Sequence, residues 1–284
     1  MPSDPVGGDS LAQARDPGDG APSSPASGLL AELAPRLDRC AVLLDIDGTL
    51  LDMAATPREV FVPPGLAETL RGLLHQAAGA LALVSGRSLN DIDLIFAPDV
   101  FPAVGGHGAE MRLAGAAETV AVTAPPLDRE LKRRLAAIAR LSPGILLEDK
   151  GYSLALHYRL APHAEAEIFR QVDAVRAELP NLPVEILPGK FVCEIKPSGF
   201  NKATGVMQLM QQQPFKGRRP FFIGDDVTDE SVFAIMPDFG GLAFSVGRQA
   251  MGVAHQFATP EEVRRWLAGL LAAAGAGTNA AHSG

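Results

Sequence analysis

The sequence has little cysteine, no long apolar run and no excess of positive charge. Cys40 and Cys193 are its two cysteines in 284 residues, which excludes a disulfide framework. Nothing places them at a metal-ligand spacing, so we expect two reduced thiols in the core. No apolar stretch approaches the roughly 18 residues of a membrane helix, and residues 1–28 lack the basic start and apolar segment of a signal peptide. These absences predict a cytoplasmic protein that contacts no membrane.

The charge is negative overall, with 33 acidic against 25 basic residues and a net charge of −8. Such a surface disfavours nucleic acid and anionic membranes as partners. An anionic ligand would therefore need a local cationic pocket or a bound metal ion. Apolar residues make up 47% of the chain, enough for a large core and about two domains at this length.

Two terminal segments have little to bury. Residues 1–28 are rich in Pro, Gly, Ser, Asp and Ala and are predicted to form a disordered arm. The Gly- and Ala-rich residues 274–284 are predicted to be a flexible tail. Between them, apolar strands alternate with helical patterns, which predicts an α/β fold with a Rossmann-like parallel sheet. The predicted strands of this sheet are 41–44, 80–84, an apolar run within 220–226, and 242–246; the predicted helices are 29–37, 65–76, 89–96, 201–212, 228–236 and 261–273.

The pattern changes between residues 111 and 198. Leu154, Leu156 and Tyr158 alternate with smaller or polar residues, as is typical of an antiparallel sheet with one open face. Because strand–helix units resume afterwards, we predict an α+β domain over 111–198, inserted into a core formed by 29–110 and 199–273. Its predicted extended segments lie near 118–123, 144–149, 152–158, 183–187 and 190–196, and its helices near 127–141 and 163–179.

Acidic pairs follow two strands of the predicted parallel sheet. Asp45 and Asp47 end the first strand, where Gly48 permits a sharp turn, and Asp225 and Asp226 end another. Neighbouring parallel strands end at the same edge, so we expect these carboxylates to crowd together there. A hard divalent cation, most plausibly Mg²⁺, would relieve their repulsion. The alternatives are a solvated turn at the first pair and an acidic helix start at the second.

Two further residues lie where an anion would bind. Lys202 stands in the first turn of a predicted helix, where it opposes the helix dipole unless an anion is present. Ser85 lies where a strand ends and a helix begins, so backbone amides there favour an anion. The glycines near 105–108 lack the spacing of a dinucleotide-binding loop. A cation, an ammonium, a hydroxyl and amides are what phosphoryl transfer requires.

Four short motifs occur in the chain order of the haloacid-dehalogenase-like phosphatases, which the sequence resembles. They are DIDGT from Asp45 to Thr49, Ser85-Gly86-Arg87, Lys202, and GDDVTDE from Gly224 to Glu230. Longer stretches are similar to the trehalose-6-phosphate phosphatase family over roughly residues 38–270, namely GGHGAE, EDKGYSLALHYR, CEIKPSGFNK and GDDVTDE. One departure is Ala203, where the family usually has glycine after the lysine. Helix N-termini accept alanine readily, so we expect no loss of chemistry.

The resemblance implies a fold, a reaction and catalytic residues. The fold is a haloacid-dehalogenase-like core with an inserted cap that closes over the phosphate site and excludes water. The reaction is Mg²⁺-dependent hydrolysis of trehalose 6-phosphate to trehalose and inorganic phosphate through an aspartyl-phosphate. Asp45 would be the nucleophile, Asp47 the acid and base, and Lys202 the catalytic cation. Asp45, Asp225 and the backbone carbonyl of Asp47 would hold the metal. Asp229 would not bind the metal directly but would hold Lys202 or a metal-bound water. Asp226 would be a further ligand or would orient the loop.

The same resemblance implies residues that contact the substrate. Those expected near the phosphate or the cleft are Thr49, Ser85, Gly86, Arg87, His107 and Asn201; those expected on the cap are Glu148, Lys150, Lys190, Glu194 and Lys196. Glu194 and Lys196 are the strongest of the cap residues because they share one face of a strand. A solvated sheet face is the alternative for each cap residue, and packing beside the hinge is the alternative for His107. His157 and Arg159 are interpreted as structural, and Trp266 as part of the core.

Other functions stay open at this point. The first is a phosphatase of the same fold for sucrose phosphate or a hexose phosphate. The second is an inactive module that senses a sugar phosphate or docks on a synthase, although the chain keeps the nucleophile and the metal ligands. The third is a phosphomutase, which would have to exclude water from its aspartyl-phosphate. A sugar phosphate is the expected small-molecule partner, with a trehalose-phosphate synthase as a further candidate.

Overall fold

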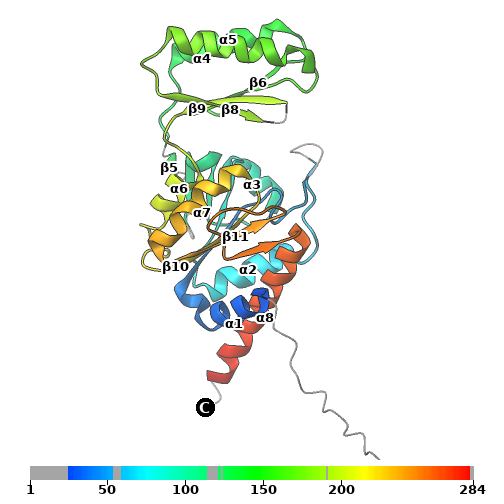
Figure 1. Ribbon diagram of the computed structural model, residues 1–284, viewed down its shortest axis with the longest axis vertical. Coiled ribbons are helices and arrows are strands. Elements are labelled where there is room, and N and C mark those ends of the chain that lie inside the picture. Colours follow the sequence, from blue (N-terminus) through cyan, green and yellow to red (C-terminus); the bar gives the residue numbers. More distant parts are fainter. Residues whose placement is uncertain (1–24, 54–58, 114–120, 123, 190, 282–284) are drawn as a thin grey trace, which may run out of the picture.

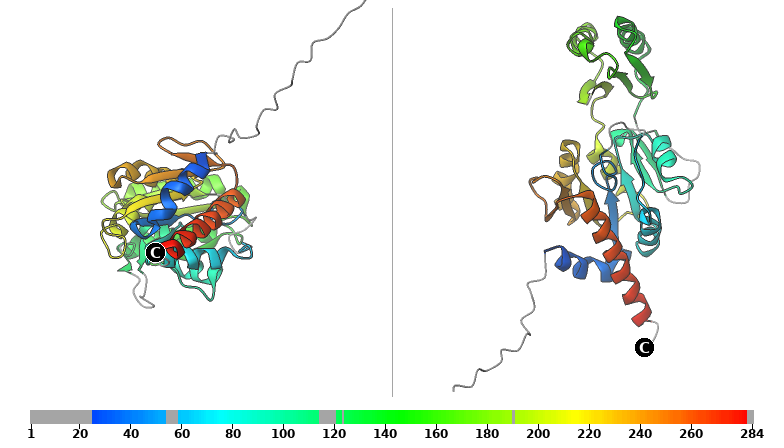
Figure 2. Two further views of the ribbon diagram at one scale, coloured as in Figure 1. Left: turned by 90° about the horizontal axis from the view of Figure 1, so that it is seen from below. Right: turned by 90° about the vertical axis from the view of Figure 1, so that its right-hand side faces the viewer.

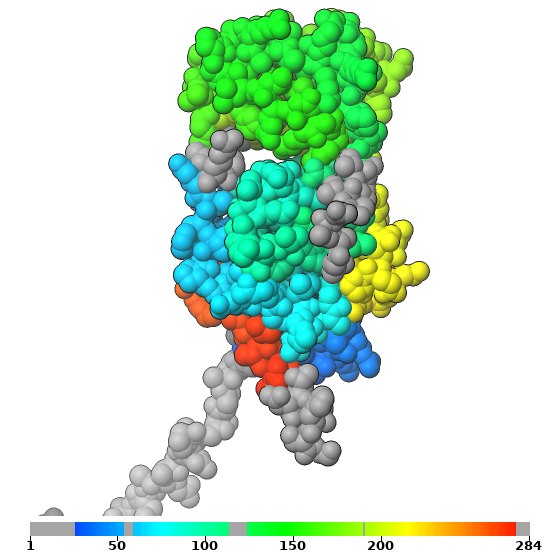
Figure 3. Space-filling model, turned by 180° about the vertical axis from the view of Figure 1, so that it is seen from behind, coloured from blue at the N-terminus to red at the C-terminus, as the bar shows by residue number. Residues whose placement is uncertain are grey.

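The chain folds around two sheets, a large one and a small one, which Figure 1 shows one above the other. The computed structural model describes residues 25–53, 59–113, 121–122, 124–189 and 191–281. Figure 2 shows the small sheet with its helices standing above the large one, and helix α8 extending at the opposite end. The space-filling view shows the surface hollowed where the two parts meet (Figure 3). Within the described residues, no helix is both long and apolar enough to cross a membrane.

The large sheet is the predicted parallel sheet. Its order is β12-β11-β10-β1-β2-β3-β4-β5, with β1 in the middle, and all neighbours up to β3 run parallel. Two antiparallel strands, β4 and β5, extend one edge. The bounds are β1 Cys40–Leu44, β2 Leu81–Val84, β3 Ala103–Gly105, β4 Glu110–Arg112, β5 Ala121–Val122, β10 Arg219–Gly224, β11 Leu242–Val246 and β12 His255–Phe257.

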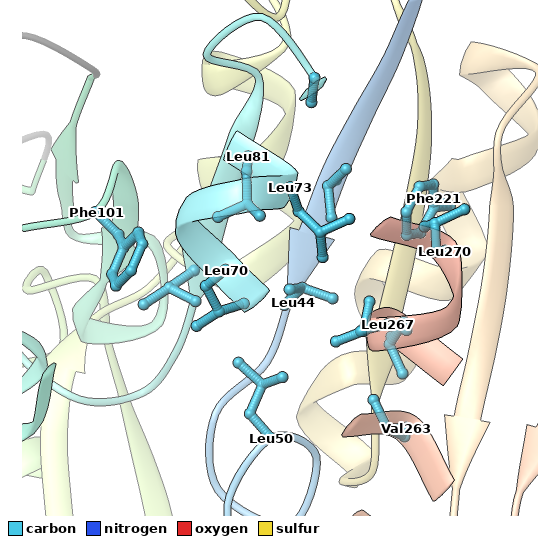
Figure 4. Close-up of a cluster of buried hydrophobic side chains, with 14 of the residues drawn as sticks. Leu44, Leu50, Leu70, Leu73, Leu81, Phe101, Phe221, Val263, Leu267 and Leu270 are labelled. Atoms are coloured by element: carbon cyan, nitrogen blue, oxygen red, sulfur yellow. The ribbon is translucent and has the colours of Figure 1, made fainter. Parts of the chain in front are cut away.

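Helices cover both faces of this sheet, which is why its central strands are apolar throughout. On one face Leu44 packs with Leu70 and Leu73 of α2 and with Leu267 and Leu270 of α8 (Figure 4). The other face packs against α6 and α7. The helices of this part are α1 Pro25–Leu33, α2 Leu66–Gln76, α3 Leu89–Phe96, α6 Lys202–Leu209, α7 Glu230–Ile235 and α8 Pro260–Ala281; the 3-10 turns are η1 Ala34–Arg39, η2 Gly106–Gly108, η5 Val227–Asp229 and η6 Met236–Phe239.

The small sheet is antiparallel, in the order β6-β7-β9-β8. Two helices cover one face, and the other face is turned toward the large sheet (Figure 1). Leu154, Leu156, Cys193 and Ile195 lie on the helix side in one apolar cluster, so the predicted α+β part with an open face is confirmed. The bounds are β6 Leu146–Asp149, β7 Leu154–His157, β8 Val184–Gly189, β9 Val192–Pro197, α4 Arg129–Ile138, α5 Glu165–Glu178, η3 Ala139–Leu141 and η4 Pro162–Ala164.

The ends of the chain and the start of the insert differ from the prediction. Helix α1 begins at Pro25, so the arm was predicted too long; the Trp266 indole donates to the Ala26 carbonyl at 3.0 Å and ties this helix to α8. The arm's first 24 residues lie outside the described ranges. Helix α8 continues to Ala281, where a tail was predicted from 274, because alanine favours the helix and Ala274 is buried.

Strands β4 and β5 belong to the large sheet, whereas the insert was predicted to begin at residue 111. Most of the extended segment predicted near 118–123 lies outside the described residues. Both cysteines are free and buried, as the sequence predicted.

Candidate active site

The acidic motifs of β1 and β10 meet at the carboxyl edge of the large sheet. Leu44 pairs with Ile223, and the Asp45 amide donates to the Ile223 carbonyl at 3.0 Å, so both strands end together. Gly48 has φ +77°, and a Cβ there would clash with the Asp225 carboxylate. Glycine is therefore required both for the turn and for the close approach of Asp225. Carboxylate oxygens of Asp45, Asp225 and Asp229 all lie within 4.8 Å of one another.

Lys202 joins this cluster from the start of α6. Its ammonium donates to Asp45 Oδ1 and to Asp229 Oδ1, each at 2.7 Å, with only 4% of the residue exposed. Burial opposes the charge, but the two carboxylates outweigh it and raise the pKa of Lys202 above its usual value. Asn201, predicted to contact substrate, uses its side-chain oxygen to accept from the Thr204 amide at 2.9 Å. It caps the helix and so positions Lys202.

The two acids farthest along the chain support the loop. Asp229 is fully buried; one oxygen accepts from Lys202, and the other accepts from the amides of Asp225 and Asp226 at 3.0 Å each. Both of its oxygens thus already accept hydrogen bonds from the protein. Asp226 is exposed and accepts from the Val227 amide at 2.6 Å, as a helix cap does. Of the second acidic pair, Asp226 therefore fits the alternative interpretation, an acidic residue at a helix start.

Asp45 and Asp225 remain the carboxylates in need of positive charge. Burial is the largest cause that raises the pKa of Asp45 well above its usual value; Lys202 opposes the rise, and Asp229 and Asp225 add to it. Burial, followed by the charge of Asp229, raises the pKa of Asp225 to about 6. No lysine or arginine in the described part of the chain forms an ion pair with Asp225. Hard oxygen donors that lack a full counter-charge fit a divalent cation.

Replacing Asp225 by asparagine should stabilise the metal-free protein increasingly as pH rises from about 4 to about 7. Since the folded-state pKa of Asp225 is raised from 3.8 to about 6, the wild type loses stability as pH rises through that window. Asparagine does not ionise, so the variant lacks this loss of stability. We expect the gap between the thermal midpoints of Asp225→Asn and wild type, measured in EDTA, to widen with pH. His107 titrates in the same window in both proteins, so its contribution cancels in the difference. A difference in thermal midpoint that stays constant with pH would contradict the raised pKa of Asp225.

The other predicted catalytic carboxylate, Asp47, is held by an arginine. Arg87 Nε lies 2.5 Å from Asp47 Oδ2, and Arg87 Nη2 lies 2.6 Å from Asp47 Oδ1. Arg87 was predicted to contact substrate; here its guanidinium forms a two-pronged pair with the carboxylate. The buried Ser85 hydroxyl accepts from the Arg87 amide at 3.1 Å, and the Thr49 hydroxyl lies 3.5 Å from Asp225 Oδ1. The Thr49 hydroxyl thus lies beside the acidic cluster, and the Ser85 hydroxyl lies at the turn that carries Arg87.

His107 packs over the same turn. A Cβ on Gly86 would overlap the His107 imidazole, so the glycine of this motif makes room for the ring. The histidine itself has φ +53°. Burial is the main cause that lowers its pKa to about 4, with Glu194 of the small sheet opposing and Lys202 adding to the shift. His107 is therefore neutral at pH 7.

Four predicted cap residues lie on or beside the face of the small sheet that is turned toward the core. Glu194 accepts from the Ser153 hydroxyl at 2.7 Å and has the Lys150 ammonium at 3.6 Å. Glu148 pairs at 2.8 Å with His157, which the sequence suggested was structural. Lys196 is buried and pairs with Glu185 while donating to the Phe200 carbonyl. Lys190 lies outside the described residues.

Sequence reasoning missed two residues that hold the site together. Arg248, after β11, donates to the carbonyls of Asp225 and Asp226. Glu110 accepts from the Leu89 amide at 2.6 Å and so caps the helix that follows Arg87. One signal was available for Arg248, because it follows a strand that neighbours β10 and must reach the same edge of the sheet.

A parallel core with acids at two strand ends, a lysine at a helix start and an inserted antiparallel sheet defines a phosphatase of the haloacid-dehalogenase type. The trehalose-phosphatase family model matches residues 43–259, and the chain belongs to this family. A probable trehalose-phosphate phosphatase of Sinorhizobium fredii is 43% identical over 219 residues, covering 77% of this chain and 82% of the relative. The Escherichia coli trehalose-6-phosphate phosphatase is 36% identical over 227 residues, covering 80% and 85%.

The fold is also found in a solved structure. The C-terminal domain of the trehalose-6-phosphate phosphatase of Candida albicans superposes with a TM-score of 0.68 at 20% identity, covering 86% of this chain and 96% of that one. At this identity the likeness shows the fold alone. The predicted fold class and the predicted family are both confirmed.

Proposed function

We propose that the chain hydrolyses trehalose 6-phosphate to trehalose and inorganic phosphate, with Mg²⁺ as its cation. The observation that carries this proposal is the buried Lys202 ammonium bridging Asp45 and Asp229 beside Asp225. This observation supports the proposal because three carboxylates and an ammonium gather in one cluster at the sheet edge, which is the set of groups that the reaction would need. Membership of the trehalose-phosphatase family supports the substrate.

Asp45 is the nucleophile in this proposal. Lys202 occupies Oδ1, which leaves Oδ2 to attack phosphorus. A bond forms between this oxygen and phosphorus while the bond from phosphorus to the sugar oxygen breaks. The attack needs an ionised carboxylate near a phosphate dianion, and Lys202 supplies part of the required positive charge. Thr49 and Ser85 would hold phosphate oxygens.

The metal would be held by side-chain oxygens of Asp45 and Asp225 and by the backbone carbonyl of Asp47. When bound, Mg²⁺ would supply positive charge that lets these acids and a phosphate dianion approach each other. Asp229 would not be a ligand, since its oxygens already accept from Lys202 and from two amides. It would keep the loop and the lysine in position.

Asp47 is the proposed proton carrier. It would give a proton to the departing sugar oxygen and would then take one from the water that attacks the aspartyl-phosphate, which releases phosphate and restores Asp45. The Arg87 guanidinium holds its two oxygens and so fixes the direction of the carboxylate. In this arrangement Arg87 would act through Asp47.

The open face of the small sheet is proposed to recognise the sugar. This face is turned toward the core (Figure 1), and Glu194 and Lys196 alternate along β9 with the buried Cys193 and Ile195, which pack on the helix side. A disaccharide offers many hydroxyls for hydrogen bonds with such groups. The residues proposed for this role are Glu148, Lys150, Lys190, Glu194 and Lys196, together with His107 of the core. A trehalose-phosphate synthase would supply this substrate and is the proposed partner in the same pathway.

Orthophosphate release from a panel of sugar phosphates tests the function. With Mg²⁺ present, turnover of trehalose 6-phosphate should exceed that of sucrose 6-phosphate and glucose 6-phosphate by at least about tenfold, which is about 1.4 kcal/mol of discrimination. EDTA should stop the reaction, and added Mg²⁺ should restore it. Similar rates on all three would indicate a general sugar phosphatase. Absence of turnover would indicate a binding module, and an isomerised product a phosphomutase.

A further inference from the structure

The backbone that carries Asp225 is held on both of its polar sides. Asp229 Oδ2 accepts from the amides of Asp225 and Asp226 at 3.0 Å each. Arg248 holds the opposite groups: its Nε donates to the Asp225 carbonyl at 2.9 Å, and its Nη2 donates to the Asp226 carbonyl at 3.2 Å. Glu230 accepts from the same Nη2 at 2.6 Å and anchors the guanidinium.

We propose that Arg248 is a positioning residue for the divalent cation, because it fixes the backbone that aims the Asp225 carboxylate at the acidic cluster. This inference rests on the proposed function, of which the cation is a part. The planar fork of arginine reaches two adjacent carbonyls at once, whereas a lysine ammonium at the end of a flexible stem lacks this geometry. Arg248 itself contacts no carboxylate of the cluster formed by Asp45, Asp225 and Asp229.

The charge of Arg248 alone would act against this role. A positive side chain beside a cation site repels the cation, so charge by itself predicts tighter metal binding when Arg248 is removed. Loss of the two hydrogen bonds from Arg248 to the backbone carbonyls predicts weaker metal binding, because a loosened loop no longer presents Asp225 in a fixed direction. The two effects have opposite signs. Arg248→Lys keeps the charge and loses the fork, and it therefore isolates the geometric effect.

The test measures Mn²⁺ binding to the full chain by electron paramagnetic resonance of free Mn²⁺, below the thermal midpoint of each variant. Arg248→Lys should raise the dissociation constant about tenfold, the lower end for groups that orient metal ligands. Saturating Mg²⁺ should restore most of the phosphatase activity lost at low Mg²⁺. Glu230→Gln, which leaves Arg248 in place without its anchor, should raise the dissociation constant by a smaller factor.

Arg219→Lys is the matched control. The Arg219 side chain has a similar arrangement, with Nε donating to the Gly240 carbonyl at 2.7 Å and Nη1 to Glu32 at 2.6 Å, at the opposite end of β10 from Gly224. It should leave Mn²⁺ binding unchanged. If the wild type binds Mn²⁺ and Arg248→Lys binds it equally tightly or more tightly, the role of Arg248 is overturned while the proposed function stands. A wild-type chain without any Mn²⁺ binding would overturn both the inference and the metal dependence of the proposed function.

Discussion

Replacing Asp45 by asparagine should abolish the hydrolysis of trehalose 6-phosphate while the chain stays folded. The carboxamide is no nucleophile, so we expect orthophosphate release to fall by at least about a thousandfold, which is about 4 kcal/mol of barrier. Asparagine keeps an oxygen that can accept from Lys202. It also removes a carboxylate whose charge is disfavoured by burial and by two acidic neighbours. The thermal midpoint should therefore be equal to that of the wild type or higher.

Asp52→Asn is the control for this substitution. Asp52 lies a few residues farther along the same segment, with its side chain 69% exposed and paired with Arg264 at 3.2 Å. It should keep the wild-type rate, because an exposed ion pair contributes little and lies outside the acidic cluster. Hydrolysis by Asp45→Asn at a rate comparable to that of the control would contradict the assignment of the nucleophile.

Replacing Lys202 by methionine should remove both activity and a large part of the stability. The substitution leaves Asp45 and Asp229 buried without their shared counter-charge, and breaking a buried ion pair from one side typically costs about 3–5 kcal/mol. We expect denaturant unfolding in EDTA to show a loss of this size. Orthophosphate release should fall by about a hundredfold or more, since the charge that steadies the phosphoryl group is gone.

Lys132→Met is the control for charge removal at a surface pair. The Lys132 ammonium lies 2.7 Å from Asp149, the same distance as in the Lys202 pairs, but this pair is much more exposed. Removing this pair should lower the free energy of unfolding by less than about 1 kcal/mol. If the two variants lost the same stability, the buried bridge would not be what holds the cluster together.

The central part of the site could be predicted because it follows from topology. Two short apolar runs ending in acids predict parallel strands, and parallel strands deliver their ends to one edge. Asp45 and Asp225 meet there, and Lys202 reaches Asp45 from a helix start that Asn201 caps. Neither step required knowledge of side-chain rotamers.

The partners of individual side chains could not be predicted in this way. Arg87 was predicted to contact the substrate, and in the structure it forms an ion pair with Asp47. Glu148 pairs with His157, which was interpreted as structural. Arg248 was not considered at all. Such contacts depend on which rotamers long side chains adopt after the backbone is placed. A sequence can indicate that Arg248 lies at the same sheet edge, but it does not show which groups the side chain reaches.

The predicted start of the C-terminal tail was wrong, and strand β3 was not predicted, for a different reason. Glycine and alanine in the last segment suggested disorder, yet alanine is the strongest helix former and α8 continues through it to Ala281. Strand β3 has three residues, too few to show any periodicity, and it forms because β2 offers a parallel edge beside it. In both cases tertiary packing and intrinsic propensity outweighed the composition of the segment.

The most direct test of the account is to find the phosphoryl group on the protein. The wild-type chain, mixed with trehalose 6-phosphate and Mg²⁺ and quenched in acid within one turnover, should yield a peptide containing Asp45 that is heavier by one phosphoryl group. The Asp45→Asn chain should yield no such peptide. Rapid turnover with no phosphoryl group on Asp45, or with the group on another residue, would contradict the account.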